Sequence, residues 1–126
     1  MRSQSVKVLD LADEEFADTL MGLGLKRNVA KTLTYLKNVD EVTSREIERG
    51  SDLRQPEVSN AMRELKNMNW VVIREQKKPG KGRPFKIYRL DEKINSIIKK
   101  LEQQKSIESR RMMDNIQRLK LMKLGN

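Results

Sequence analysis

The alternation of apolar and polar positions in the middle of the chain predicts a helix followed by a two-stranded hairpin. The helix is expected over about 55–68: Pro56 suits the first helical position and Gln55 would then be the N-cap, a boundary left open by two residues either way. The run 70–73 and the segment 85–90 are rich in β-branched and aromatic residues, as strands are. The Gly- and Pro-containing segment 77–84 between them predicts a turn. The apolar positions of the helix recur at three- and four-residue steps: Val58, Ala61, Met62 and Leu65.

Two amphipathic helices are predicted before this unit. The first begins near Asp10 or Asp13, either of which can cap it, and ends by Met21, before Gly22 and Gly24. The second covers about 27–38, where apolar residues recur at helical spacing. Both are expected to pack in the core.

A short helix is predicted between them and the central helix. Thr43 and Glu46 have the spacing of a capping box, so the helix starts after Thr43 and runs to about Arg49. Gly50 is expected to break it. Val42, just before the cap, is expected to form a strand of one or two residues against the hairpin.

From Asp91 onward a helical pattern runs almost to the end, without Gly or Pro before Gly125. Two groups of apolar residues occur in it, and Ile107 is the only large apolar residue in the stretch 103–111 between them. Either the helix bends or breaks in that stretch, or two helices fold back. An apolar stripe on such a helix must be buried, which predicts dimerisation through 91–126; packing against its own domain is the alternative. The predicted dimerisation residues are Ile94, Ile97, Ile98, Leu101, Met112, Ile116 and Leu119.

Positive charge is concentrated locally. The formal net charge is +9, and Arg54 to Leu90 carry ten Lys and Arg against three Glu. A helix with a polar outer face followed by a basic hairpin is the layout of a winged helix-turn-helix, so double-stranded DNA is the predicted partner of a domain at 1–90. A solvated polar face and a solvated basic loop are the alternatives. The predicted DNA-binding residues are Arg54, Gln55, Ser59, Asn60, Arg63, Lys66, Lys77, Lys78, Lys81, Arg83 and Lys86.

Missing residue types exclude several kinds of chemistry. The chain contains no Cys and no His, so disulfides, thiolate metal sites and His-based catalysis are excluded. No metal, cofactor or enzymatic activity is expected. The sequence has no apolar run of the roughly 20 residues that span a bilayer and no signal-peptide pattern, which predicts a cytoplasmic protein without membrane contact.

The stretch 23–90 resembles the DNA-binding domain of winged-helix regulators of the TrmB, MarR and ArsR group, most closely that of TrmB-like proteins. The resemblance rests on Leu23-Gly24-Leu25, on 42–47, on 58–65 as recognition helix and on 82–88, which closes the wing. It implies a mainly α fold with a small β-hairpin wing; the pattern at 91–126 adds a long C-terminal helix. The resemblance also implies a dimeric, sequence-specific transcription regulator of archaeal type. TrmB-like regulators carry a large sugar-sensing domain, and metal-sensing ArsR-like proteins use Cys and His ligands; this sequence provides neither, which leaves an effector in doubt.

Two other functions remain open from the sequence. An architectural protein would bind duplex DNA by charge without base preference, and a winged helix can also serve as a protein-interaction module. The ratio of specific to non-specific DNA affinity separates an architectural protein from a regulator. Whether DNA binding weakens steeply with salt separates a protein-interaction module from both.

Overall fold

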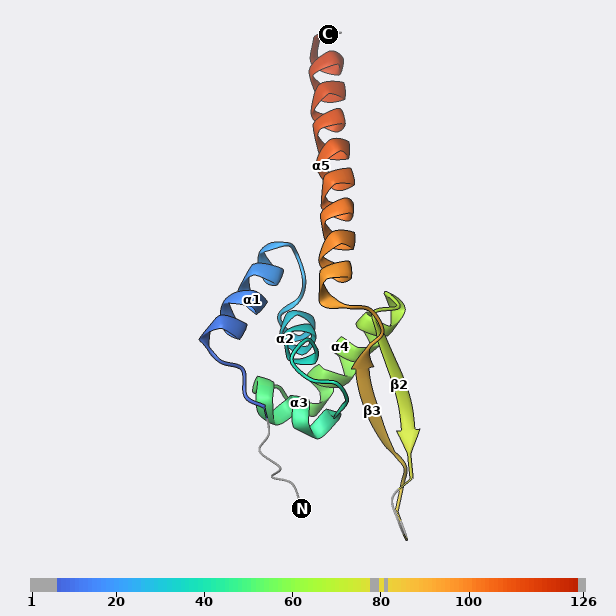
Figure 1. The fold of residues 1–126 in the computed structure, drawn as a ribbon. Coiled ribbons are helices and arrows are strands. Elements are labelled where there is room, and N and C mark those ends of the chain that lie inside the picture. Colours follow the sequence, from blue (N-terminus) through green and yellow to red (C-terminus); the bar gives the residue numbers. More distant parts are fainter. Residues whose placement is uncertain (1–6, 78–79, 81, 125–126) are drawn as a thin grey trace. The chain divides into compact units, whose positions relative to one another are not determined.

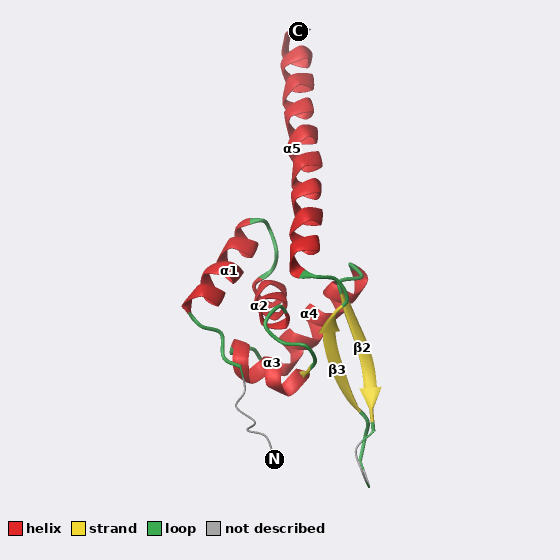
Figure 2. Ribbon diagram, in the orientation of Figure 1, coloured by secondary structure: helices red, strands yellow, loops and turns green. Residues whose placement is uncertain are grey.

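The computed structural model describes residues 7–77, 80 and 82–124, and shows a mainly helical chain with a small antiparallel sheet (Figures 1 and 2). It forms two compact units, 1–93 and 94–126, which are treated separately below. The first unit has the winged-helix fold, and the second is one long helix, so the predicted fold class is confirmed.

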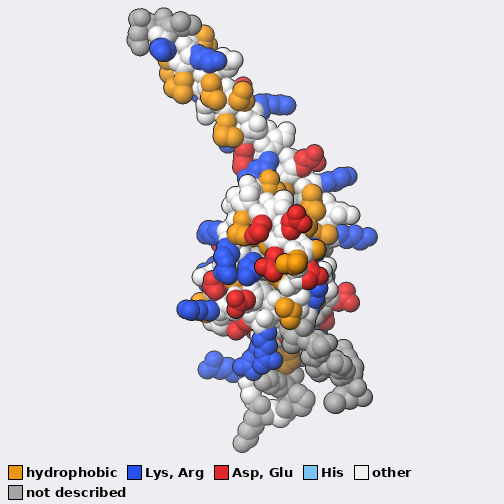
Figure 3. Space-filling model, turned by 90° about the vertical axis from the view of Figure 1, so that its left-hand side faces the viewer, with side chains coloured by type: hydrophobic (Ala, Val, Ile, Leu, Met, Phe, Trp, Pro, Cys, Tyr) orange, Lys and Arg blue, Asp and Glu red, His pale blue; other side chains and the backbone are white. Residues whose placement is uncertain are grey.

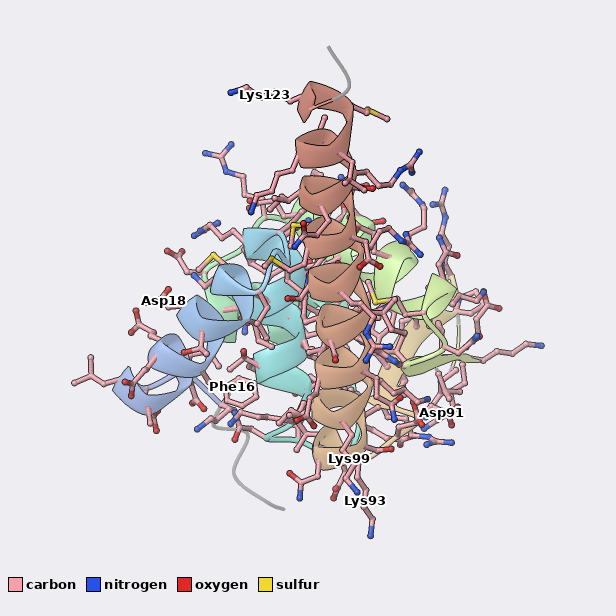
Figure 4. All side chains as sticks on the ribbon, turned by 90° about the horizontal axis from the view of Figure 1, so that it is seen from above. Phe16, Asp18, Asp91, Lys93, Lys99 and Lys123 are labelled. Carbon is pink, nitrogen blue, oxygen red and sulfur yellow. The ribbon has the colours of Figure 1, made fainter. Side chains whose placement is uncertain are left out.

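The two predicted N-terminal helices are present. Helix α1 (Leu11–Gly22) begins at the N-cap Asp10, whose carboxylate accepts the Asp13 N–H at 2.9 Å. Helix α2 (Arg27–Leu36) ends two residues earlier than expected. Figure 4 shows Phe16 on the side of α1 that faces α2, with Asp18 pointing outward.

The third helix runs farther than the sequence predicts. Strand β1 (Val42–Thr43) precedes α3 (Ser44–Ser51), and the predicted capping box is formed: Glu46 N–H donates to Thr43 Oγ1 at 3.3 Å and Thr43 N–H to Glu46 Oε1 at 2.9 Å. The expectation that Gly50 breaks this helix is wrong. Gly50 is helical and buried against Tyr35, and the helix ends one residue later, before Asp52, which has a left-handed backbone at φ 54°.

The central helix, α4 (Gln55–Asn67), begins within the two residues left open by the prediction. Arg54, not Gln55, is the N-cap: its backbone is extended, and its carbonyl accepts the first intrahelical bond, from Val58 N–H at 3.1 Å. Glu57 reaches back and accepts the Arg54 N–H at 2.9 Å. This bond supports the start of α4 at Gln55, so Pro56 takes the second helical position.

The hairpin consists of β2 (Val71–Gln76) and β3 (Phe85–Leu90), paired antiparallel from Val71–Leu90 to Gln76–Phe85. The range predicted for β3 is confirmed. For β2 the prediction of 70–73 is wrong at both ends, because Trp70 N–H still bonds to Leu65 O, and the polar residues 74–76 pair with 85–87. Strand β1 adds to the other edge of β3, giving the order β1-β3-β2.

The core of the first unit lies between α2, α3, α4 and the sheet. Its largest fully buried side chains come from all three helices. The four residues predicted as the inner stripe of α4 are all buried, at 0–2% exposure. The fully buried apolar side chains of these helices include Val29, Leu33, Tyr35, Leu36, Ile47, Val58 and Leu65.

A buried carboxylate joins α1 to the end of α2. Asp13 is 4% exposed and accepts hydrogen bonds from Asn38 Nδ2 at 3.0 Å, Lys37 Nζ at 3.2 Å and Asp10 N–H at 3.1 Å, with Lys7 Nζ at 3.3 Å. Burial alone raises the pKa of the Asp13 carboxyl, but these four donors together hold that pKa well below its usual range. Asp13 is therefore a structural anion, and the sequence did not indicate it.

The second unit is helix α5 (Ile94–Leu124), which is continuous through 103–111. The bend or break that the sequence left open does not occur. Of the predicted dimerisation residues, Ile97 and Leu101 are buried, whereas Ile98, Met112, Ile116 and Leu119 are 41–64% exposed and Ile94 is half-buried. Figure 3 shows hydrophobic side chains exposed along this helix.

Candidate nucleic-acid interface

Helix α4 has one buried face and one polar face. Because Val58, Ala61, Met62 and Leu65 point into the core, the remaining positions face solvent. All but one of the residues predicted there are exposed, and Ser59 is half-buried. The exposed predicted residues of this segment are Arg54, Gln55, Asn60, Arg63 and Lys66.

Two of these residues already touch each other. Arg63 Nη1 donates to Asn60 Oδ1 at 3.2 Å, one helical turn away. An Arg guanidinium suits the acceptors of guanine in the major groove, and an Asn amide suits adenine. The contact holds both side chains on the outer face of α4.

The acidic residues of α4 are engaged with cations from the start of α2. Lys26 Nζ lies 3.1 Å from Glu64 Oε2, and Arg27 Nη1 lies 3.5 Å from Glu57 Oε2. In addition, Asn28 Nδ2 donates to the Glu57 carbonyl oxygen at 3.0 Å. These contacts offset the negative charge of α4 and leave its outer face to neutral and cationic side chains.

The hairpin carries the second group of predicted residues. Lys77, Arg83 and Lys86 are exposed, whereas the predicted Lys78 and Lys81 lie outside the described residues. The turn contains Gly80 at φ 83° and Gly82 at φ 130°, backbone conformations that favour glycine. Gly82 therefore has a backbone that a residue with a side chain would rarely adopt, directly before Arg83.

Arg74, one of the ten basic residues between Arg54 and Leu90, is paired with an acidic residue. Arg74 on β2 donates two hydrogen bonds of 3.0 Å to Glu41, from Nε and Nη2. These bonds lower the pKa of Glu41 and raise that of Arg74. A guanidinium held this way is a brace between β2 and the segment before β1, not an open phosphate ligand.

The first helix of the helix-turn-helix adds candidates that the sequence analysis missed. Arg45 and Arg49 are exposed and lie one turn apart on α3. In helix-turn-helix proteins the first helix crosses the DNA backbone. The signal was in the sequence, because the capping box at Thr43 fixes the start of α3 and hence the common face of both arginines.

A hollow of about 680 Å³ lies at the start of α4, lined by Arg27, Arg54 and Glu57 among others. A second, of about 750 Å³, lies beside β1 and includes Glu41 and Arg74.

The described residues contain no group of three or more Asp or Glu placed to hold a metal ion. None of the helices described is long and apolar enough to cross a membrane.

Comparison with known proteins supports the fold. No protein-family model and no curated protein matches the chain. Among solved structures, it is similar to a possible transcriptional regulator from Methanosarcina mazei Go1, with a TM-score of 0.59 and 18% identity over 88% of this chain and 98% of that chain. The transcriptional regulator PA4135 gives a TM-score of 0.50 and 19% identity over 90% and 82%.

A MarR family regulator from Neisseria meningitidis, NMB1585, matches with a TM-score of 0.48 and 16% identity, over 84% of this chain and 70% of that chain. The two better matches confirm that the chain has the winged-helix architecture indicated by the sequence.

Proposed function

We propose that this chain is a sequence-specific transcription regulator that binds double-stranded DNA as a homodimer. Helix α4 would enter the major groove, and the β2–β3 hairpin would contact the backbone or the minor groove. One observation carries the proposal: the winged-helix fold presents a polar, partly cationic helix face together with a basic hairpin.

Base reading is assigned to the outer face of α4. An α-helix fits the major groove, and Gln55, Asn60 and Arg63 have the donor and acceptor groups that distinguish base pairs there. Arg54 and Lys66, at the two ends of the helix, are suited to phosphates. Ser59 is half-buried, so its role would be limited to a close contact.

Backbone or minor-groove contact is assigned to the hairpin. Arg83 is exposed and stands between Gly82 and Pro84, so a stiff turn presents one guanidinium. A narrow minor groove has an enhanced negative potential that attracts such a side chain. Lys77 and Lys86 would neutralise phosphates and make the affinity depend on salt.

The homodimer is assigned to α5. Its exposed apolar side chains need a partner, and two copies would read half-sites about one helical turn apart, roughly 34–36 Å. The regulated DNA site is therefore expected to be palindromic.

The test is a fluorescence-anisotropy titration at several salt concentrations against a random pool of duplexes, with the bound fraction sequenced. Enrichment of a palindromic site supports the proposal. Salt-sensitive binding without an enriched sequence overturns it in favour of an architectural DNA-binding protein. No binding at low salt overturns it in favour of a protein-interaction module.

Two variants sharpen this test. Arg63→Ala is expected to relax base preference at one position of the site and to weaken binding by about 10- to 100-fold there. Arg110→Ala, which removes another exposed arginine, from α5, is the matched control and should bind as the wild type does. If Arg63→Ala weakened binding to all sequences equally, Arg63 would contact a phosphate instead.

A further inference from the structure

Helix α5 carries a seam that repeats every seven residues. One row consists of Ile98, Lys105, Met112 and Leu119, and a second row, offset by three residues, consists of Leu101, Glu108, Asn115 and Met122. Rows with this spacing form one face of a helix and are the contact rows of a coiled coil. The exposed Ile107 and Leu121 lie on the other side of the helix and are not part of this seam.

The seam has one charged layer in its middle. Lys105 Nζ lies 3.0 and 3.2 Å from the two carboxylate oxygens of Glu108 in the same chain. Both side chains remain well exposed, at 39% and 47%. Exposed apolar seam residues flank them, with Ile98 before and Met112 and Leu119 after, whereas Leu101 is already buried within its own chain.

We propose that the seam pairs with α5 of a second copy running in the opposite direction, with the two-fold axis passing between residues 106 and 107. This inference rests on the homodimer of the proposed function and specifies its geometry. In this register Lys105 faces the partner's Glu108, and Glu108 faces the partner's Lys105. The charged layer is therefore self-complementary.

The antiparallel register places Ile98 level with the partner's Asn115. The partner's Ile116 is the next residue along, so Ile98 and Ile116 are neighbours at both ends of the seam. These two side chains are 41% and 45% exposed in the single chain. A parallel, in-register pair would instead place Lys105 against the partner's Lys105 and Glu108 against the partner's Glu108, and like charges facing each other oppose association.

The absence of cysteine from the chain makes the register directly measurable. Ile98→Cys and Asn115→Cys are made as separate full-length variants and oxidised mildly, alone and as a mixture. In the proposed dimer residues 98 and 115 of opposite chains lie at the same level. Residue 98 lies about 25 Å along the axis from the partner's residue 98, and residue 115 similarly from its equivalent, beyond the roughly 7 Å that a disulfide spans between Cα atoms.

The expected result is a cross-linked dimer in the mixture and none with either variant alone. Cross-linking of each variant by itself would show a parallel dimer and overturn the proposal. Failure of all three samples to cross-link would overturn it as well.

Charge reversal gives a second, independent readout by sedimentation equilibrium. Lys105→Glu and Glu108→Lys are each expected to raise the dimer dissociation constant about tenfold or more, and the double variant is expected to restore it. Arg110→Glu, on the other side of the helix, is the control for the same charge reversal as Lys105→Glu and should leave the constant unchanged. A double variant as weak as the single ones would refute the Lys105–Glu108 pairing between chains.

The two proposals can fail separately. A cross-linked antiparallel dimer that binds no DNA would refute the proposed function and leave this geometry standing. A monomer that binds DNA would refute the geometry and the dimer, but would leave DNA binding by the winged helix intact.

Discussion

Replacing Gly50 with alanine tests a close contact between α3 and α2. A Cβ built on Gly50 would overlap both the backbone carbonyl oxygen of Lys7 and a ring carbon of Tyr35. Tyr35 is 1% exposed, so its ring has no free space to move into. The Lys7 segment is also tied to α3, because Leu9 N–H donates to Gly50 O at 3.1 Å.

Two opposing effects set the size of the change. Alanine is favoured over glycine in a helix interior by about 1 kcal/mol. Forcing an extra methyl into a packed core costs about 1–3 kcal/mol, and occasionally more. Since the added methyl meets a backbone atom and a buried ring at once, we expect the upper part of that range, a net loss of about 2 kcal/mol.

The assay is thermal and denaturant unfolding of the full chain at one fixed protein concentration. A loss of about 2 kcal/mol corresponds to a fall in Tm of about 10 °C for a domain of this size. Gly22→Ala is the matched control: it is also a helical glycine, but a Cβ there meets no atom within 4 Å. That variant should be stabilised by up to about 1 kcal/mol. Gly50→Ala being as stable as the wild type, with Gly22→Ala behaving as expected, would refute the contact.

Further predictions concern the buried anion, the cap of α3 and the hairpin. Asp13→Asn is expected to lower the free energy of unfolding by about 2 kcal/mol, because the charged hydrogen bonds of a buried carboxylate are lost; urea denaturation measures this. The folded-state pKa of Asp13 lies below its unfolded value of about 3.9, so its contribution is complete above that pH and is lost as the pH falls further. In acid titrations, stability should therefore decline more steeply below about pH 4 in the wild type than in Asp13→Asn. Thr43→Ala should cost about 1 kcal/mol through loss of the bond to the Glu46 N–H, and an unchanged unfolding midpoint would contradict this. Arg83→Ala and Lys86→Ala should each weaken DNA binding on all sequences. In anisotropy titrations, each should also reduce the slope of log affinity against log salt by about 1. An unchanged slope would mean that these side chains do not contact phosphates.

Local patterns predicted most of the elements of the first unit. The capping box at Thr43 and Glu46, the inner stripe of α4 and the strand 85–90 were all placed correctly, because each depends on residues close together in sequence. The differences lie at boundaries decided elsewhere. The start of α4 depends on the reach of the Glu57 carboxylate to Arg54, and the extension of β2 depends on pairing with β3.

For the candidate interface, the sequence identified which side chains are polar and outward-facing, but not which of them are free. The count of basic residues from Arg54 to Leu90 includes Arg74, yet Glu41, 33 residues away, holds that guanidinium. Contacts from the start of α2 likewise neutralise Glu57 and Glu64. Such pairings join positions distant in the chain, and periodicity contains no information about them.

By itself, the sequence determined the fold class: helical and strand periodicities indicated a winged helix with a long terminal helix. The absence of Cys and His also excluded disulfides, thiolate metal sites and His-based catalysis. Only the tertiary structure decided that Gly50 is a packing site rather than a helix stop and that Asp13 is a buried anion. The physical reason is range. Caps, turns and amphipathic stripes are set by neighbours within a few residues, whereas burial and ion pairing depend on what the folded chain brings alongside.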